Sequence, residues 1–164
     1  MEPAAKTCVI RKARAWEDAA IRALVLSERM RPVDLKPENF LVAVEGDEII
    51  GTVQMRRHSD GTHELGSLVV APNWRRQGVA RRLIDMLLKE EAQSVYMITA
   101  RAHWRRYVPW GFELVSGGAV PNSIRFHHLI GSLGSIVSLF KRRSMRRLVI
   151  LRRKPIDAGF PQGV

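Results

Sequence analysis

The stretch "ELGSLVVAPNWRRQGVA", residues 64–80, joins a strand to a helix through a basic turn. Its first part, residues 65–71, is an uninterrupted run of apolar and small residues that is typical of a buried strand and stops at Pro72. From residue 79 to residue 90 the apolar positions recur at helical spacing, at Val79, Leu83, Met86 and Leu87. The order strand, basic turn, helix therefore predicts one α/β unit.

The basic turn has the chemistry of an anion-binding site. The first four amides of a helix lack intrahelical partners, and the helix dipole adds partial positive charge at that end. Gly78 permits a ligand to approach the backbone closely, while Arg75 and Arg76 add full positive charges. The turn thus predicts a site for phosphate or pyrophosphate. It contains neither a P-loop nor a G-x-G-x-x-G fingerprint, and a surface arginine cluster at a helix end is the alternative.

The remaining segments predict an alternating fold of strands and helices. The pattern β-α-β-β-β-α-β-α-β, followed by a helix and a strand, indicates a mixed sheet with helices on both faces, in the α/β or α+β class. A hairpin is expected around residues 45–48, "EGDE". Strands are predicted at 7–14, 39–44, 49–58, 64–71, 94–100, 111–115 and 148–151, and helices at 16–30, 79–90, 101–108 and from 123 onward.

Several motifs in one order resemble the GNAT family of N-acetyltransferases. "RRQGVA" matches the R/Q-x-x-G-x-G/A motif of that family, and "VIRKARAWEDAAI" (9–21), "ELGSLVVAP" (64–72) and "YVPWGFELV" (107–115) resemble its opening strand and helix, its central strand and its Y-x-x-x-G-F segment. The resemblance covers about residues 9–116, and the length of the chain predicts one domain over residues 1–164. Its sheet would have seven strands, mostly antiparallel, and would open at the central strand to hold acetyl-CoA as cosubstrate.

The resemblance also implies which residues bind the cofactor. In the family the basic turn holds the pyrophosphate, and the central strand pairs with the pantetheine arm. One departure is "TARAHW" after the fifth predicted strand, where many members have an asparagine. The implied cofactor-binding residues are Leu68, Val69, Val70, Arg75, Arg76, Gln77, Gly78, Val79 and Ala80.

Acetyl transfer to an amine needs a neutral amine, a polarised thioester carbonyl and a proton for the leaving thiolate. A backbone amide near Leu68 or Val69 would serve the oxyanion. Tyr107, whose ordinary pKa near 10 lies above that of a thiol near 8.5, matches the family's usual acid. Glu64, at the start of the central strand, is the candidate base, with a solvated residue at a strand end as the equal alternative. His63 and His103 are weaker candidates.

The acceptor is predicted to be a small molecule. The motifs are nearest to the amino-acid-acetylating branch, including the acetyltransferase domain of N-acetylglutamate synthases, and they favour an amino acid or polyamine over a protein amine. Two alternatives are a non-catalytic acyl-CoA-binding or regulatory domain and a nucleic-acid-binding module. No array of stacking aromatic residues and no helix-turn-helix signal supports the second.

Composition limits the protein class. The chain has 164 residues, of which 46% are hydrophobic, without a run of 18 uncharged apolar residues, so a spanning helix is not expected. Its first residues lack an apolar signal core, and we expect a cytoplasmic protein. The single cysteine, Cys8, excludes an internal disulfide and a cysteine-cluster zinc site, and no H-E-x-x-H motif occurs. We therefore expect no metal.

The positive charge is concentrated near the C-terminal end. Residues 141–154 carry eight of the basic residues and no acidic one, which leaves a net charge of +3 for the rest of the chain. Residues 123–154 predict a helix followed by a basic final strand, and 155–164 predict a flexible tail. The helix carries one apolar stripe that the chain's own sheet, a second subunit or, less favoured, a membrane surface would cover: Phe126, Leu129, Ile130, Leu133, Val137 and Phe140.

Overall fold

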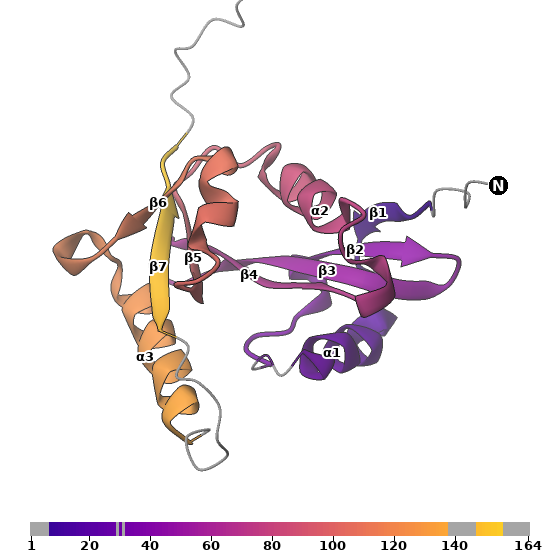
Figure 1. The fold of residues 1–164 in the computed structure, drawn as a ribbon, viewed down its shortest axis with the longest axis horizontal. Coiled ribbons are helices and arrows are strands. Elements are labelled where there is room, and N and C mark those ends of the chain that lie inside the picture. Colours follow the sequence, from indigo (N-terminus) through magenta and orange to yellow (C-terminus); the bar gives the residue numbers. More distant parts are fainter. Residues whose placement is uncertain (1–6, 29, 31, 138–146, 156–164) are drawn as a thin grey trace, which may run out of the picture. The chain divides into compact units, whose positions relative to one another are not determined.

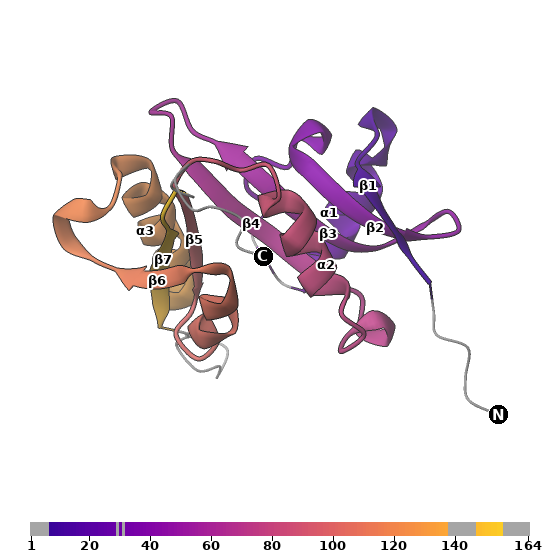
Figure 2. The ribbon, with the colours of Figure 1, turned by 90° about the horizontal axis from the view of Figure 1, so that it is seen from above.

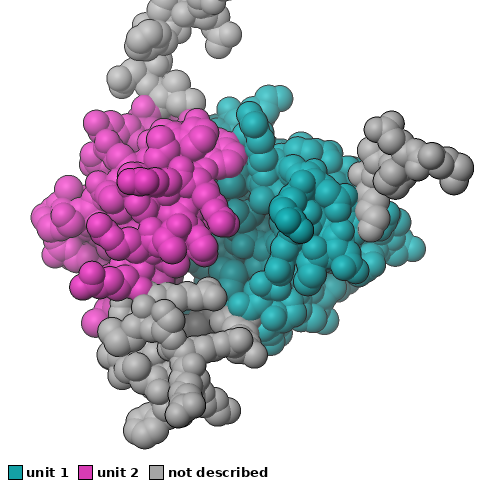
Figure 3. Space-filling model, in the orientation of Figure 1, with its two compact units in different colours: residues 1–56, 65–90 teal, residues 57–64, 91–164 magenta. Residues whose placement is uncertain are grey.

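The computed structural model describes residues 7–28, 30, 32–137 and 147–155. The chain forms two compact units, coloured separately in Figure 3. The first unit comprises residues 1–56 and 65–90, and the second comprises residues 57–64 and 91–164. The organisation of all 164 residues as one domain stays a prediction.

The first unit is built on the strands β1 (Val9–Lys12), β2 (Phe40–Glu45), β3 (Glu48–Arg57) and β4 (His63–Val70), which lie in the order β1-β2-β3-β4. β1 and β2 are antiparallel, as are β2 and β3. The predicted hairpin is confirmed, because Glu45 pairs with Glu48 around a tight turn. Gly46 has a φ of 55° there, in the left-handed region that such two-residue turns require.

Two helices cover opposite faces of this part of the sheet (Figure 1). Ile21 and Val25 of α1 (Asp18–Ser27) share an apolar cluster with Val42 of β2. The next residue along β2 points to the other face, and there the pair Ala43 and Gly51 lies under α2 (Val79–Leu88). A methyl group added at Gly51 would lie 3.2 Å from Leu83, so this glycine lets α2 pack closely.

Two predicted helices differ from the structure at one residue each. The helix predicted at 16–30 begins later, at Asp18, and Trp16 lies in the preceding 3-10 turn, where it is 76% exposed. Met86 is 47% exposed, since Ile84 and Leu88 extend the apolar stripe of α2 on the side away from it. The buried residues of α2 are Val79, Leu83, Ile84 and Leu88.

The second unit contains β5 (Val95–Ala100), β6 (Phe112–Val115) and β7 (Leu148–Arg153), in the order β5-β7-β6 with antiparallel pairing. The helix α3 (Asn122–Val137) packs against β5 and β7 (Figures 1 and 2). Its Ile124 is fully buried beside Tyr96 and Val120. Short 3-10 helices complete the fold: η1 (Ala15–Glu17), η2 (Pro37–Asn39), η3 (Pro72–Trp74), η4 (Trp104–Trp110) and η5 (Gly117–Ala119).

The apolar stripe predicted on α3 is covered only in part. Phe126 is 61% exposed and Leu129 is 55% exposed, so the first of the three expected covers, the chain's own sheet, does not cover the stripe at these two positions. Ile124, which the predicted stripe omitted, takes the buried position instead. The side chains of Leu133, Val137 and Phe140, and residues 141–146 of the basic run, lie outside the described residues. No helix in the described part of the chain has the length and apolarity needed to span a membrane.

The seven predicted strands and the four longer predicted helical segments are all present, which confirms the α/β fold class. The opening of the sheet at the central strand stays a prediction.

Candidate active site

The basic turn ends in an uncapped helix N-terminus. Arg76 and Gly78 have φ values of 60° and 77°, and Gly78 is the N-cap residue of α2. No described side chain caps this end. The amide of Arg82 donates to the carbonyl of Gly78 at 3.0 Å and begins the helical hydrogen bonding. The amides of residues 79–81 therefore have no partner within the helix, as the predicted anion site requires.

The two arginines of the turn differ in what they contact. The guanidinium group of Arg75 forms an ion pair with Glu28, and its Nε donates to the carbonyl of Val70 at 3.0 Å. Gln77 donates from its side-chain amide to the carbonyl of Asn73 at 2.8 Å. Arg75 and Gln77 thus hold the turn in shape. The exposed Arg76 and the helix amides are left as the groups best suited to a phosphate.

The predicted cofactor residues of β4 alternate between the core and a second face. Val69 is buried in the apolar cluster of the first unit, whereas Leu68 and Val70 are half-buried. Val79 is also buried, and Ala80 is half-buried. Any contact of Val69 and Val79 with a cofactor would therefore come from their backbone atoms.

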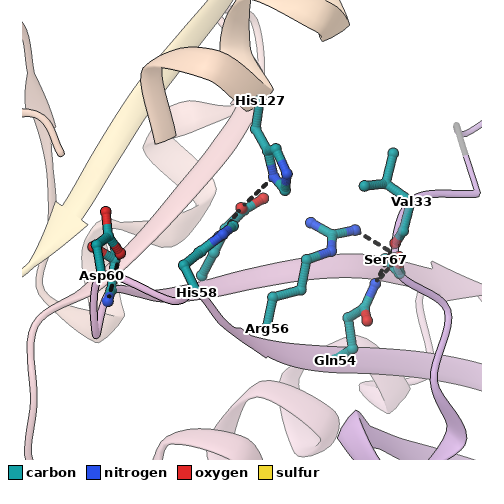
Figure 4. A network of polar contacts seen from close by, with 9 residues as sticks. Val33, Gln54, Arg56, His58, Asp60, Ser67 and His127 are labelled. Atoms are coloured by element: carbon teal, nitrogen blue, oxygen red, sulfur yellow. Dashed lines mark hydrogen bonds and ion pairs between the residues drawn. The ribbon is translucent and has the colours of Figure 1, made fainter. Parts of the chain in front are cut away.

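A polar network fixes an irregularity inside β4. Ser67 has a φ of 48°, although it lies within a strand. The hydroxyl of Thr52 donates to the carbonyl of Ser67 at 2.9 Å, and Arg56 Nη2 donates to the Ser67 hydroxyl at 3.2 Å. The Gln54 amide lies 2.7 Å from the same hydroxyl (Figure 4). Three alternate residues of β3, all buried, thus hold this backbone conformation at a fixed point of β4.

Gly66 leaves room for the Arg56 side chain of the same network. A methyl group added there would lie 2.4 Å from Arg56 Nη1, which is closer than any real contact. Arg56 is only 7% exposed, and its guanidinium group lies against Gly66 of β4. The absence of a side chain at residue 66 therefore makes room for the positively charged side chain of Arg56 inside the protein.

Glu64, the predicted base, is buried and held by two histidines. It is 3% exposed. Its Oε2 lies 2.8 Å from Nε2 of His58 and 2.8 Å from Nδ1 of His127. The two imidazole rings are 4.7 Å apart in an edge-to-face arrangement and point toward one another from different elements (Figure 4). The alternative of a solvated strand-end residue is wrong.

Sequence reasoning missed both histidines and named His63 and His103 instead. His63 Nδ1 contacts Glu91 Oε2 at 2.9 Å, away from Glu64. His58 reaches Glu64 because its amide closes the turn onto the carbonyl of Thr62, which folds the chain back at this point. That turn, "SDGTH", was visible in the sequence and could have paired His58 with the start of β4. His127 lies three residues beyond the buried Ile124, but its partner is 63 residues away and only the fold identifies it.

Tyr107, the predicted acid, lies in η4, which continues through Pro109 to Trp110 instead of ending before the proline. Its ring meets Phe112 edge-to-face, with centroids 6.3 Å apart. Burial raises the pKa of Tyr107 above its ordinary value, while a hydrogen bond with Thr99 and the charge of Arg106 oppose that shift. The phenol is therefore protonated at neutral pH, as a general acid must be.

A cavity of about 660 Å³ in the second unit lies outside the predicted site. None of the predicted catalytic or cofactor-binding residues lines it. Its polar lining includes Arg101, Arg125 and His128.

Comparison with solved structures shows the same fold in several acetyltransferases. N-acetylglutamate synthase from Neisseria gonorrhoeae, solved with coenzyme A and N-acetyl-glutamate, has a TM-score of 0.69 at 17% identity. The match covers 92% of this chain and 35% of that protein, so the chain spans about a third of its length. Rv2747 from Mycobacterium tuberculosis, solved with CoA and NLQ, has a TM-score of 0.64 at 20% identity, covering 90% of this chain and 99% of that one.

A third protein is the diaminobutyrate acetyltransferase EctA from Paenibacillus lautus, solved with its substrate L-2,4-diaminobutyric acid and coenzyme A. It has a TM-score of 0.63 at 14% identity, covering 92% of this chain and 96% of that one. No curated protein sequence matches the chain closely. Residues 36–114 match the family model described as "Acetyltransferase (GNAT) domain". Residues 36–114 therefore match the GNAT family of acetyltransferases, and the family resemblance of the motifs is confirmed over this segment.

Proposed function

We propose that the protein transfers the acetyl group of acetyl-CoA to a primary amine of a small molecule, in particular an amino acid or a polyamine. The observation that carries this proposal is Glu64, a buried carboxylate on β4 that two histidines hold in one orientation. The solved proteins described as bound to coenzyme A and to amino-acid ligands support both the donor and the class of acceptor.

The cofactor would bind to β4 and the basic turn. The amides at the start of α2 and the exposed Arg76 are suited to the pyrophosphate, because positive partial charge and full charge meet there. The pantetheine arm would pair with backbone groups of Leu68 and Val70. The Val70 carbonyl already accepts from Arg75, which leaves the groups around Leu68 as the main partners.

Chemistry would follow direct attack of the amine on the thioester. Glu64 takes a proton from the acceptor ammonium, directly or through water, so that the nitrogen lone pair can attack the carbonyl carbon. A backbone amide near Leu68 or Val69 stabilises the oxyanion. The C–S bond then breaks, and Tyr107 gives its proton to the leaving thiolate. The attacking nitrogen loses its second proton to solvent, and Tyr107 regains a proton from solvent. The products are the acetylated amine and free CoA.

The experiment is detection of the acetylated product by mass spectrometry after incubation with acetyl-CoA and a panel of amino acids, polyamines and a lysine-containing peptide. We expect product with a free amino acid or a polyamine. Product with the peptide alone would assign a protein-amine acceptor. Binding of CoA without any product would assign an acyl-CoA-binding domain instead. A cytoplasmic location and a homodimer remain expectations.

A further inference from the structure

His58, Glu64 and His127 bring together the ligand set of a transition-metal site. Two imidazole nitrogens and one carboxylate oxygen all lie within 4.8 Å of one another. They come from the residue after β3, from β4 and from α3, so three separate segments converge on one point. Two histidines and one carboxylate, with a position open for water, form a common protein site for Zn²⁺.

We infer that this cluster is a Zn²⁺-binding site that competes with acetyl transfer. The sequence analysis predicted no metal site, because the three residues do not form a contiguous metal motif. The site is an addition to the proposed function and not a requirement of it, since a metal held by Glu64 would occupy the carboxylate that the amine needs as its base.

Two of the three distances between ligand atoms are close to those of a metal site, and the third, between the two histidine nitrogens, is at most 4.8 Å. Zn–N and Zn–O bonds of about 2.0–2.2 Å place neighbouring ligand atoms in a tetrahedron roughly 3.3–3.5 Å apart. The two His–Glu contacts are 2.8 Å, so each would open by about half an ångström. Side-chain rotation supplies a movement of that size.

The two histidines can also bind the metal without a net loss of protons. A neutral histidine carries one proton on either ring nitrogen. His58 Nε2 and His127 Nδ1, which now face the carboxylate, become ligand atoms when the proton of each ring moves to its other nitrogen. No net loss of protons from a neutral histidine is needed. The Zn²⁺ ion then carries the charge that balances the buried carboxylate.

The exposed fractions of the three side chains leave the metal position accessible to solvent. The Glu64 side chain is 4% exposed, while those of His58 and His127 are 13% and 20% exposed. The carboxylate is thus the deepest ligand, and the histidines lie toward solvent. Such a site can exchange its ion, as an inhibitory site must.

The test is calorimetric titration of the intact protein with Zn²⁺, together with the visible absorption spectrum of the Co²⁺ form. We expect one ion per chain and the absorption of four-coordinate Co²⁺. His127→Asn keeps a hydrogen-bond donor but removes an imidazole ligand, and it should weaken Zn²⁺ binding at least tenfold. His63→Asn is the matched control, because His63 also contacts a glutamate but lies outside the cluster. The affinity of this variant for Zn²⁺ should stay within twofold of that of the wild type.

Three results would overturn the inference: no saturable Zn²⁺ binding, equal affinity in His127→Asn and wild type, or an equal loss in His63→Asn. Melting curves without metal verify that each variant is folded. Inhibition by Zn²⁺ rests on the proposed function and is measured in a separate assay. Zn²⁺ should lower the rate of acetyl transfer, and a chelator should restore that rate. If no acetyl transfer is found with any acceptor, the proposed function fails, while the titration still decides the metal site.

Discussion

Nδ1 of His127 lies 2.8 Å from Oε2 of Glu64, although 63 residues separate them in the chain. His58 contacts the same oxygen from the other end of a short turn. A carboxylate fixed from two sides loses little conformational entropy when a substrate binds, so its orientation is set in advance. This arrangement makes Glu64 the residue whose replacement is most informative.

Glu64→Gln should lower kcat by about 10²–10⁴-fold, the usual contribution of a general base. The amide has nearly the same size and can still accept from a histidine, but it cannot take up a proton. Steady-state rates at saturating acetyl-CoA measure the effect. Glu91→Gln is the control, because Glu91 pairs with His63 in a similar half-buried contact. Equal losses in the two variants would remove Glu64 as the base.

Gly78→Glu should weaken CoA binding at least tenfold, because it places a negative charge where the phosphates are expected. Gly78 has a left-handed φ of 77°, so any side chain also strains the turn. Gly46→Glu is a matched control: Gly46 has a φ of 55° in the hairpin, and a side chain at either glycine would begin in open space. Calorimetry with CoA separates the cases. A dissociation constant for Gly78→Glu equal to that of the control would argue against the turn as the phosphate site.

Tyr107→Phe should lower kcat by about 10²-fold or more while leaving CoA affinity nearly unchanged, because a proton donor acts only in the transition state. Because the pKa of Tyr107 is raised, the phenol stays protonated as the pH rises. Activity should therefore fall only at a pH above the ordinary pKa of tyrosine, about 10. A profile of kcat between neutral and strongly alkaline pH should lose this alkaline limb in the variant. An unchanged kcat, with chemistry limiting the rate, would show that another group is the acid.

Gly66→Ala should destabilise the protein by about 1–3 kcal/mol, since the added methyl group forces the buried Arg56 from its place. Gly118→Ala is the control, because its methyl group would have no neighbour within 4 Å. Urea unfolding of both variants measures the free energy difference. If the two variants are equally stable, Arg56 can move at no cost and the close contact at Gly66 has no energetic importance.

The sequence alone predicted the order of strands and helices well, because each strand is a short apolar run between turn residues. It failed where tertiary packing decided exposure. Met86 and Phe126 occupy helical positions that periodicity assigns to a buried face, yet neither is covered by the sheet in the described structure. Glu64 was found through its place in the family pattern, whereas the contact with His127 depends on how α3 packs, which no local pattern contains.

Release of free thiol from acetyl-CoA in the presence of single amines measures acetyl transfer, the central claim of the proposed function, most directly. We predict release above the uncatalysed rate with at least one free amino acid or polyamine, together with loss of that release in Glu64→Gln. If CoA binds but no amine in the panel raises thiol release above the rate without protein, the proposed catalytic function is wrong.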